Sequence, residues 1–489
     1  MRFTWLLCSL VLVISGWGGA DAPGKLDAAG LLALQFPDVR LDAATHDDGG
    51  FLDVEGTIGG TIHFEVLLPD TWNGRFAMGG GGGFVGSVQN AERGAVKEGY
   101  ATAGTDTGHQ GKGTVAAWAQ DDLLAQVNFG HLAVHRTAEA AKALIRAYYG
   151  KGPEYSYFLG CSRGGGQAMM EAQRYPQDFD GIVAGAPAFN WNGIAALFVR
   201  IAQVVYPDPK QLDQPVIPPD LLGVIYDELM RQCDAQDGLE DGIIMDPRAV
   251  HFDVSKVPGI TPEQQAAIAV IYEGPKNGDG PLFPGFSYGA EKDPGGWLGW
   301  LTGPNPQLLQ EQQAPTLTFA FGTQAFKYLF MNDPEWDYST YDFSTFAEDT
   351  RLGASNLNAT NPDLSALRER GGKLILWHGW GDPALPALSL IDYYEQVKAL
   401  DPQAENYVRL FMVPGCLHCG GGPGPSNVDW LPILRAWREE GKAPDVIIAT
   451  GKEKDGATPE RPLYPYPQQA MYKGQGDPFD ADSFEPKGP

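Results

Sequence analysis

One five-residue run constrains the fold of this 489-residue chain more than any other feature: Gly160-Cys161-Ser162-Arg163-Gly164. It stands between an apolar, strand-like segment (YSYFL) and a segment with helical character (QAMMEAQRY). In that context the flanking glycines permit a sharp strand-to-helix turn, which lifts a serine hydroxyl above the edge of a sheet at the N-terminus of a helix. Short matches of this kind also arise by chance as ordinary Gly/Ser turns, so the prediction depends on the flanking strand and helix.

The segments around this run alternate between strand and helix patterns. The expected elements are strands at 60–68, 75–78, 100–106, 155–159, 373–377 and 407–413, and helices at 132–149 and 389–400. Alternation of this kind predicts an α/β protein with a mostly parallel sheet flanked by helices.

The middle third of the chain interrupts this pattern. Between residues 191 and 361, Pro-rich turns (YPDPKQLDQPVIPPD), an acidic loop and Trp/Phe/Tyr-rich stretches replace the alternation. The chain is about three times as long as a usual single domain, which leaves room for a second unit. We therefore predict an α/β domain formed by 23–190 and 362–489, interrupted by a lid domain at 191–361.

The first residues are typical of a secretory signal peptide. Arg2 precedes an apolar run (FTWLLCSLVLVIS) too short to cross a bilayer, and Ala20-Asp21-Ala22 provides a small-residue cleavage site. Cleavage after about Ala22 predicts a mature protein that is secreted or periplasmic, in a compartment where disulfides persist. No second apolar run reaches the length of a membrane span.

The net charge excludes two classes of partner. The chain carries 35 Lys+Arg against 61 Asp+Glu, a formal net charge of −26, and has no dense basic stripe. Such a chain does not follow a phosphate backbone or an anionic membrane surface. Neither nucleic acid nor membrane is therefore expected as a partner, and the sequence leaves the oligomeric state open.

An acid and a base for Ser162 are expected later in the chain, each in a loop after a strand. Asp382 follows KLILW in HGWGDPALP, and His418 follows YVRLFMV in PGCLHCGGG. His418 would take the Ser162 proton as general base, and Asp382 would orient the imidazole. His378 is the main competitor, but its loop would have to supply both partners. A histidine in a glycine-rich loop also has a plainer explanation, a hydrogen bond to its own backbone.

A glycine run after an early strand is the candidate oxyanion hole. Gly79 to Gly83 follow the expected strand at 75–78, and glycine lets the backbone approach a reacting carbonyl closely. We expect one amide donor from Gly82 or Gly83 and a second from the N–H of Arg163. A glycine run by itself also fits a flexible turn.

The cysteines flank the same candidates. Cys161 precedes Ser162 and Cys419 follows His418, so a hydrogen bond between the serine and the histidine would bring the two thiols within bridging range. Alternatively, Cys416 and Cys419 form a C-x-x-C redox pair or half of a zinc site, although no thioredoxin-like βαβ unit surrounds them.

Three carboxylates within eight residues form a candidate cation site. Asp234, Asp237 and Asp241 lie in CDAQDGLEDGII around a glycine turn, where backbone carbonyls could complete an oxygen shell for Ca²⁺. The spacing differs from that of an EF-hand, and a solvated acidic loop accounts for the pattern equally well.

Taken together, these blocks resemble the tannase and feruloyl esterase family of α/β-hydrolases. The resemblance covers nearly the whole mature chain, through GGGGGFVGS, GTDTGH, YFLGCSRGGGQAMMEAQRYPQDFDGIVAGAPAFNW, CDAQDGLEDGII, GGKLILWHGWGDP and FMVPGCLHCGGGPG. It implies an α/β-hydrolase fold with a large inserted lid and the triad Ser162, Asp382 and His418. It also implies a disulfide between Cys161 and Cys419.

The resemblance further implies a structural calcium ion in the lid. Its ligands would be the side chains of Asp234, Asp237 and Asp241 with the carbonyls of Leu239 and Ile243.

This chain departs from the family pattern at its cysteines. Relatives often pair the position of Cys233 with a cysteine after the calcium loop, but DPRAVHFD has none, and Cys416 stands where another residue is usual. We therefore expect one disulfide, with Cys233 and Cys416 free, and a calcium loop less braced than in relatives.

The resulting hypothesis is a secreted serine carboxylesterase that hydrolyses esters of aromatic or phenolic acids, of the feruloyl esterase or tannase type, through an acyl-enzyme on Ser162. Its substrates would be small aromatic esters, plant-derived ones among them, and no organic cofactor is expected. The aromatic lid should offer an apolar slot for a planar acyl group. The candidates for lining that slot are Trp297, Trp300, Phe326, Phe330 and Trp336. Which acyl group and alcohol are preferred stays open.

Two other classes of protein stay open. A calcium-dependent binding protein without catalysis could use the same scaffold, although an intact triad argues against it. A thiol-disulfide oxidoreductase would use Cys416 and Cys419, and a bridge from Cys161 to Cys419 would exclude it.

Overall fold

The computed structural model describes residues 26–278, 280–453 and 456–488. The predicted signal peptide, residues 1–22, lies outside the described residues. Within the described ranges, no helix is long and apolar enough to span a membrane.

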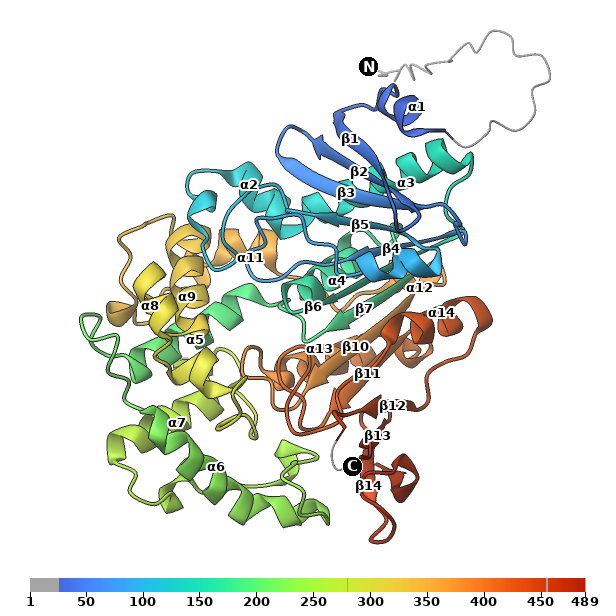
Figure 1. Cartoon of the computed structure of the whole chain (residues 1–489). Coiled ribbons are helices and arrows are strands. Elements are labelled where there is room, and N and C mark those ends of the chain that lie inside the picture. The colour runs from blue at the N-terminus through green and yellow to red at the C-terminus, as the bar shows by residue number, and fades with distance from the viewer. Residues whose placement is uncertain (1–25, 279, 454–455, 489) are drawn as a thin grey trace, which may run out of the picture.

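A nine-stranded sheet runs through the molecule (Figure 1). Its strands are β1 (Val39–Asp47), β2 (Phe51–Ile58), β3 (Ile62–Pro69), β4 (Arg75–Gly79), β5 (Ala101–Thr105), β6 (Tyr155–Cys161), β7 (Gly181–Gly185), β10 (Lys373–Gly379) and β11 (Val408–Val413). Their spatial order is β1-β2-β3-β5-β4-β6-β7-β10-β11. The pairings from β1 to β5 are antiparallel, and every pairing from β5 to β11 is parallel.

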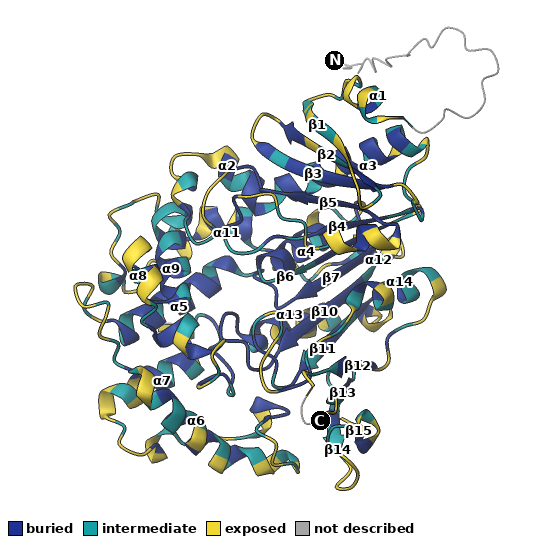
Figure 2. Cartoon of the chain, viewed as in Figure 1, coloured by how far each residue is buried: buried dark blue, intermediate teal, exposed yellow. Residues whose placement is uncertain are grey.

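Helices cover both faces of this sheet. They include α1 (Ala28–Leu32), α3 (Ala133–Tyr149), α4 (Arg163–Arg174), α12 (Ser365–Glu369), α13 (Ala387–Leu400) and α14 (Trp430–Glu440), while the short helix α2 (Leu123–Val127) packs against α11. Within β6, Phe158 packs into the core shared with α3, α4 and α13, whereas Tyr157 and Leu159 pack into the core shared with α14. Strands covered on both faces need small or apolar residues throughout, and every residue of β7 is buried. Figure 2 shows the same burial along the central strands.

The segment between β7 and β10 is built mainly of helices. Besides α12, they are α5 (Trp191–Val205), α6 (Pro219–Cys233), α7 (Pro262–Glu273), α8 (Pro306–Gln312), α9 (Leu317–Gln324), α10 (Phe346–Asp349) and α11 (Arg351–Leu357), with a short hairpin of β8 (Lys276–Asn277) and β9 (Gly280–Pro281). We call residues 191–361 the inserted segment. Figure 1 shows its helices α5 to α9 gathered to one side of the sheet.

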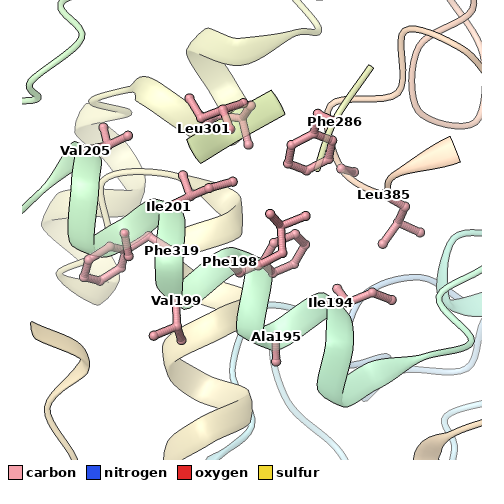
Figure 3. Close-up of a cluster of buried hydrophobic side chains, with 14 of the residues drawn as sticks. Ile194, Ala195, Phe198, Val199, Ile201, Val205, Phe286, Leu301, Phe319 and Leu385 are labelled. Carbon is pink, nitrogen blue, oxygen red and sulfur yellow. The ribbon is translucent and has the colours of Figure 1, made fainter. Parts of the chain in front are cut away.

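Helix α5 is the centre of the inserted segment. Its sequence, WNGIAALFVRIAQVV, is largely apolar, and Asn190 caps it by accepting the N–H of Gly193 (3.2 Å). Figure 3 shows its side chains packed among other residues of this segment, with Leu385 from the loop after β10 in the same cluster. This cluster therefore joins the inserted segment to the edge of the sheet.

The predicted α/β architecture is confirmed, and each expected strand and helix coincides with an observed one to within two residues at each end. The sequence analysis did not predict β1, β2 or β7. The first of these, β1 (VRLDAATHD), is half exposed and carries charges, so it lacks a buried-strand pattern. Two small antiparallel pairs near the C-terminus were also missed. They are β12 (Ile447–Thr450) with β13 (Glu460–Leu463), and β14 (Gln469–Tyr472) with β15 (Phe484–Lys487). The domain boundaries at 190 and 361 stay a prediction.

Candidate active site

Ser162 lies in a strained turn between β6 and α4. Its φ is 63° and its ψ is −123°, and a positive φ at a residue with a side chain costs about 1–3 kcal/mol unless the surroundings fix it. The Ser162 carbonyl oxygen accepts the N–H groups of Gly166 (3.0 Å) and Ala188 (2.9 Å), which hold the turn. A Cβ on Gly160 would lie 2.4 Å from the carbonyl oxygen of Gly164, so glycine is required there. The predicted strand–turn–helix is therefore present.

Asp382 and His418 meet in a hydrogen bond. His418 Nδ1 lies 2.9 Å from Asp382 Oδ2, while Asp382 Oδ1 accepts the N–H groups of Ala384 (2.7 Å) and Leu385 (3.0 Å). Ser162 and His418 both line one cavity. Among the described side chains no hydrogen bond joins the Ser162 hydroxyl to His418, a contact that often tightens only with substrate bound.

The competing histidine, His378, contacts the same carboxylate. Its Nε2 lies 3.1 Å from Asp382 Oδ2 and 3.0 Å from the carbonyl oxygen of Leu385. It is 1% exposed and is not among the described residues that line the cavity over Ser162. His378 therefore contacts the Asp382 carboxylate from within the protein, whereas His418 faces the cavity.

Asp382 is held as a carboxylate between the two imidazoles. Burial by itself would raise its pKa, but the charge of His418 and the hydrogen bonds of both His378 and His418 outweigh burial and hold the pKa of Asp382 well below its usual value. An ionised acid at this place can fix the tautomer of His418 and stabilise its protonated form.

Cys161 and Cys419 form the expected disulfide. Their Cα atoms are 5.8 Å apart, and 258 positions separate them in sequence. Strands β6 and β11 lie three positions apart in the sheet, about 14 Å at the usual strand spacing. The loop after β11 therefore folds back across the ends of β10 and β7 to reach β6. The bridge thus ties the neighbour of Ser162 to the neighbour of His418.

Cys233 and Cys416 are free and buried, as expected. Because Cys419 is bridged to Cys161, the C-x-x-C run does not form a redox pair. Burial also raises the pKa of Cys416 to about 12, which suppresses the reactive thiolate. The oxidoreductase alternative loses its support.

A cavity of about 310 Å³ lies over Ser162 and His418, and its walls are mostly apolar. The large apolar side chains that line it are Trp191, Ile194 and Phe198 of α5, with Trp300, Phe321 and Leu385. Trp300 lies edge-on to His418, with ring centroids 5.1 Å apart, and is stacked on Phe321 at 6.4 Å. Walls of this kind suit a flat aromatic group.

Four of the five aromatic residues expected to line a substrate slot lie elsewhere. Trp300 lines the cavity, but Trp297 and Phe326 are 0% exposed in the core of the inserted segment. Phe326 is stacked on Trp336, with ring centroids 4.7 Å apart, and packs edge-on against Phe330, with ring centroids 5.5 Å apart. These side chains stabilise the inserted segment, because burying large rings against one another is favourable.

The cavity walls from α5 were missed. Trp191, Ile194 and Phe198 recur at helical spacing, so they share one face of the helix. This apolar face could have been recognised from the sequence, but the sequence does not say whether it covers Ser162 or packs into an internal core.

The expected oxyanion amides are not equally available. The N–H of Gly82 donates to Gln89 Oε1 (2.8 Å), so this amide is already engaged. Gly83 lines the cavity with a φ of 54°, and no described residue accepts its N–H. Arg163 is the first residue of α4, where N–H groups lack a partner within the helix, and it also lines the cavity. The geometry therefore favours Gly83 over Gly82, together with Arg163.

The acidic loop accepts backbone hydrogen bonds. Asp234 accepts the N–H of Gly242 (3.1 Å), and Asp237 accepts the N–H groups of Leu239 (3.1 Å) and Met245 (3.0 Å). Asp241 accepts the N–H of Ile243 (3.1 Å) and, from a side chain, Nη2 of Arg461 (3.0 Å). Burial, with Asp241 and Asp234 nearby, raises the pKa of Asp237 to about 6. In the described ranges, no group of three or more His, Cys, Asp or Glu side chains is placed to hold a metal ion.

Comparison with known proteins places these features in a family. The family model described as "Tannase and feruloyl esterase" matches residues 50–486. The chain is 32% identical to the mono(2-hydroxyethyl) terephthalate hydrolase of Piscinibacter sakaiensis, over 97% of this chain and 88% of that protein. It is 34% identical to a probable feruloyl esterase of Arthroderma benhamiae, over 86% of this chain and 81% of that protein.

A solved structure agrees in fold. Feruloyl esterase B from Aspergillus oryzae superposes with a TM-score of 0.82 at 24% identity, covering 93% of this chain and 98% of that one. With the strand–serine–helix turn and the Asp–His pair at the ends of adjacent strands, these matches show that the chain belongs to the tannase and feruloyl esterase family of carboxylic ester hydrolases.

Proposed function

We propose that this protein is a serine carboxylesterase that hydrolyses esters of aromatic or phenolic acids, of the feruloyl esterase or tannase type. The observation that carries the proposal is the apolar cavity of about 310 Å³ that Ser162 and His418 line together with Trp191, Phe198 and Trp300. A planar acyl group can bury its ring against such walls while its carbonyl carbon lies beside the serine. Relatives named as feruloyl esterases support the same substrate class.

In the proposed reaction, Ser162 Oγ attacks the ester carbonyl while His418 accepts its proton. Asp382 holds Nδ1 of the imidazole and stabilises its protonated form. The amides of Gly83 and Arg163 donate to the oxyanion of the tetrahedral intermediate. His418 then protonates the leaving alcohol. Water, activated by the same histidine, hydrolyses the acyl-enzyme and releases the acid.

Hydrolysis of a small ester panel by wild type and Ser162→Ala tests this proposal. The panel comprises methyl ferulate, methyl gallate and a terephthalate monoester, with the released acid measured by chromatography. We expect wild type to cleave methyl ferulate and Ser162→Ala to lower kcat by about 10⁴-fold or more. Ser156→Ala, which removes a hydroxyl from β6, the strand that precedes Ser162, is the control.

Two outcomes separate this proposal from a non-catalytic binding protein. An active-site organophosphate should label wild type at Ser162. Failure to label this serine, or a Ser162→Ala variant that keeps most of the hydrolysis, would contradict the proposed mechanism.

We also propose that the loop of Asp234, Asp237 and Asp241 binds a structural calcium ion. Carboxylate and carbonyl oxygens are the ligands calcium prefers, and the carbonyls of Leu239 and Ile243 could complete the set. Binding would require the three carboxylates to turn toward a common point. Calcium should raise the melting temperature of the wild type and not that of Asp237→Asn. A wild-type melting temperature that neither calcium nor a chelator changes would contradict the proposal.

We propose, finally, that residues 1–22 are a cleaved signal peptide and that the enzyme works in the periplasm or outside the cell. We also propose that residues 191–361 act as a lid domain. The disulfide between Cys161 and Cys419 supports an oxidising compartment. The walls that α5 contributes to the cavity support the lid. N-terminal sequencing of the protein from periplasm or medium should begin at Pro23, and a chain retained whole in the cytoplasm would contradict export.

A further inference from the structure

The residue after the proposed nucleophile, Arg163, buries a cation that has no acidic partner among the described residues. Its side chain is 1% exposed. Nη2 donates to the carbonyl oxygens of Phe129 and, at 3.0 Å, of Gly130, while Nε and Nη1 have no hydrogen-bond partner among the described residues. Arg461, which is also almost buried, instead pairs with the carboxylate of Asp241 at 3.0 Å.

Aromatic faces stand where a counter-ion would be expected. The guanidinium carbon of Arg163 lies 4.4 Å from the ring centroid of Phe129 and 5.3 Å from that of Trp191. Trp191 also lines the cavity over the proposed triad. Burial lowers the pKa of Arg163 to about 9, so the side chain is still a cation at neutral pH. Rings stabilise a cation without neutralising it, so its positive field persists around the site.

A buried charge that no acid neutralises is costly to keep. The group loses its hydration, and an apolar side chain of similar size at such a place often gives a more stable protein. The proposed reaction creates a negative charge at one point, the tetrahedral oxyanion, and the backbone N–H of Arg163 is one of its two proposed donors. Because the cavity walls are mostly apolar, they screen a neighbouring charge less than water does.

We propose that the Arg163 side chain is a positioning residue of the oxyanion hole, an inference that rests on the proposed function. Its guanidinium, held by the carbonyls of Phe129 and Gly130, fixes the first turn of α4 so that the Arg163 N–H meets the oxyanion. Its unneutralised charge favours the anionic intermediate over the neutral ester. The bond from Ser162 Oγ to the ester carbon forms as the carbonyl electron pair moves to oxygen and the hydroxyl proton moves to His418. When the intermediate collapses, the alcohol leaves with that proton.

Three variants separate charge from packing. Arg163→Met removes the charge and keeps a long side chain, Arg163→Lys keeps the charge, and Arg174→Met removes a cation from the last turn of the same helix as a control. For each variant we would measure kcat and KM for methyl ferulate and the urea midpoint. We would also measure the dissociation constant of phenylboronic acid, which forms a negatively charged tetrahedral adduct with a serine.

Arg163→Met should lower kcat by about 10- to 100-fold, equivalent to about 1.4–2.7 kcal/mol, and change KM by less than about threefold. It should weaken the boronate by about the same factor as kcat, because both report the anionic state. Its urea midpoint should be unchanged or higher. Arg163→Lys should recover most of the kcat, and Arg174→Met should keep both kcat and boronate affinity.

A purely structural role would lower the urea midpoint and leave the boronate affinity of the folded protein unchanged. That result, or wild-type kcat and boronate affinity in Arg163→Met, would overturn the inference. If Arg163→Met does not fold, Arg163→Gln takes its place with the same expected outcomes. If the wild type neither hydrolyses the ester nor binds the boronate, the proposed function is refuted. If the wild type is active and Arg163→Met has the same kcat and boronate affinity, only the proposed role of the Arg163 side chain is refuted.

Discussion

Replacing Asp382 with asparagine removes one charge from the buried centre of the proposed triad while keeping the shape of the side chain. Two backbone N–H groups, of Ala384 and Leu385, point at Oδ1, so the amide oxygen of the new side chain must take that place. The amide nitrogen then faces His418 at the position of Oδ2, which lies 2.9 Å from Nδ1. To accept this donor, His418 must carry its proton on Nε2, where it cannot receive the proton of Ser162.

The wrong tautomer costs about 10⁴ in kcat, or about 5.4 kcal/mol of activation free energy. We expect Asp382→Asn to show this loss on methyl ferulate with KM changed only a few-fold, since the cavity walls are intact. His378→Gln is the matched comparison: it removes the contact at 3.1 Å and leaves the His418 bond, so a loss of about tenfold is expected. His418→Gln should fall as far as Ser162→Ala. The assignment of base and acid would be refuted if Asp382→Asn kept kcat within tenfold of wild type, or if His378→Gln lost as much as His418→Gln.

Three other predictions concern the cavity, the turn and pH. Trp300→Ala should raise KM for methyl ferulate about tenfold, because it removes a wall of the cavity. Trp336 lies outside that cavity, so Trp336→Ala should leave KM within about twofold of wild type. Equal effects of the two substitutions on KM would contradict the assigned walls. Gly160→Ala should yield no soluble, active enzyme, because its Cβ would lie 2.4 Å from the Gly164 carbonyl oxygen, and a folded, active variant would show that the turn can relax. Burial chiefly raises the pKa of Glu92 to about 7, so the folded state loses stability as the pH rises from about 4.3, the unfolded value, through 7. Glu92→Gln should therefore raise the free energy of unfolding, measured by urea denaturation, by about 1–3 kcal/mol at pH 8 and by little at pH 4. An equal gain at both pH values would show that ionisation of Glu92 is not what destabilises the folded state.

The features that could be predicted from the sequence are those encoded in short, local patterns. The turn around Ser162 depends on adjacent glycines and on the strand and helix that flank them. The loops of Asp382 and His418 each follow a largely apolar strand, KLILWHG for β10 and VRLFMV for β11, and parallel strands end at one edge of a sheet. The resemblance then paired Cys161 with Cys419, which the structure confirms.

The cavity walls depend instead on how separate helices pack. Trp297 and Trp300 are neighbours in GGWLGW, yet one is buried in the core of the inserted segment and the other faces His418. Both are tryptophans in the same short motif, so only the path of the surrounding chain decides which side chain is buried and which lines the cavity. The sequence left the choice between Gly82 and Gly83 open for a similar reason, because the hydrogen bond of the Gly82 N–H depends on where the side chain of Gln89 lies.

The bridge between Cys161 and Cys419 makes a closed covalent ring of the polypeptide between them. The whole inserted segment lies inside this ring, together with β7, β10 and β11. A protease that cuts one exposed loop anywhere between residues 162 and 418 opens the ring without releasing a fragment. Ser162 then lies on one piece and His418 on the other, but sulfur still holds the two together at the residues beside them. A protein built in this way can be cut within residues 191–361 and still keep Ser162 and His418, the proposed nucleophile and base, on one covalently joined molecule.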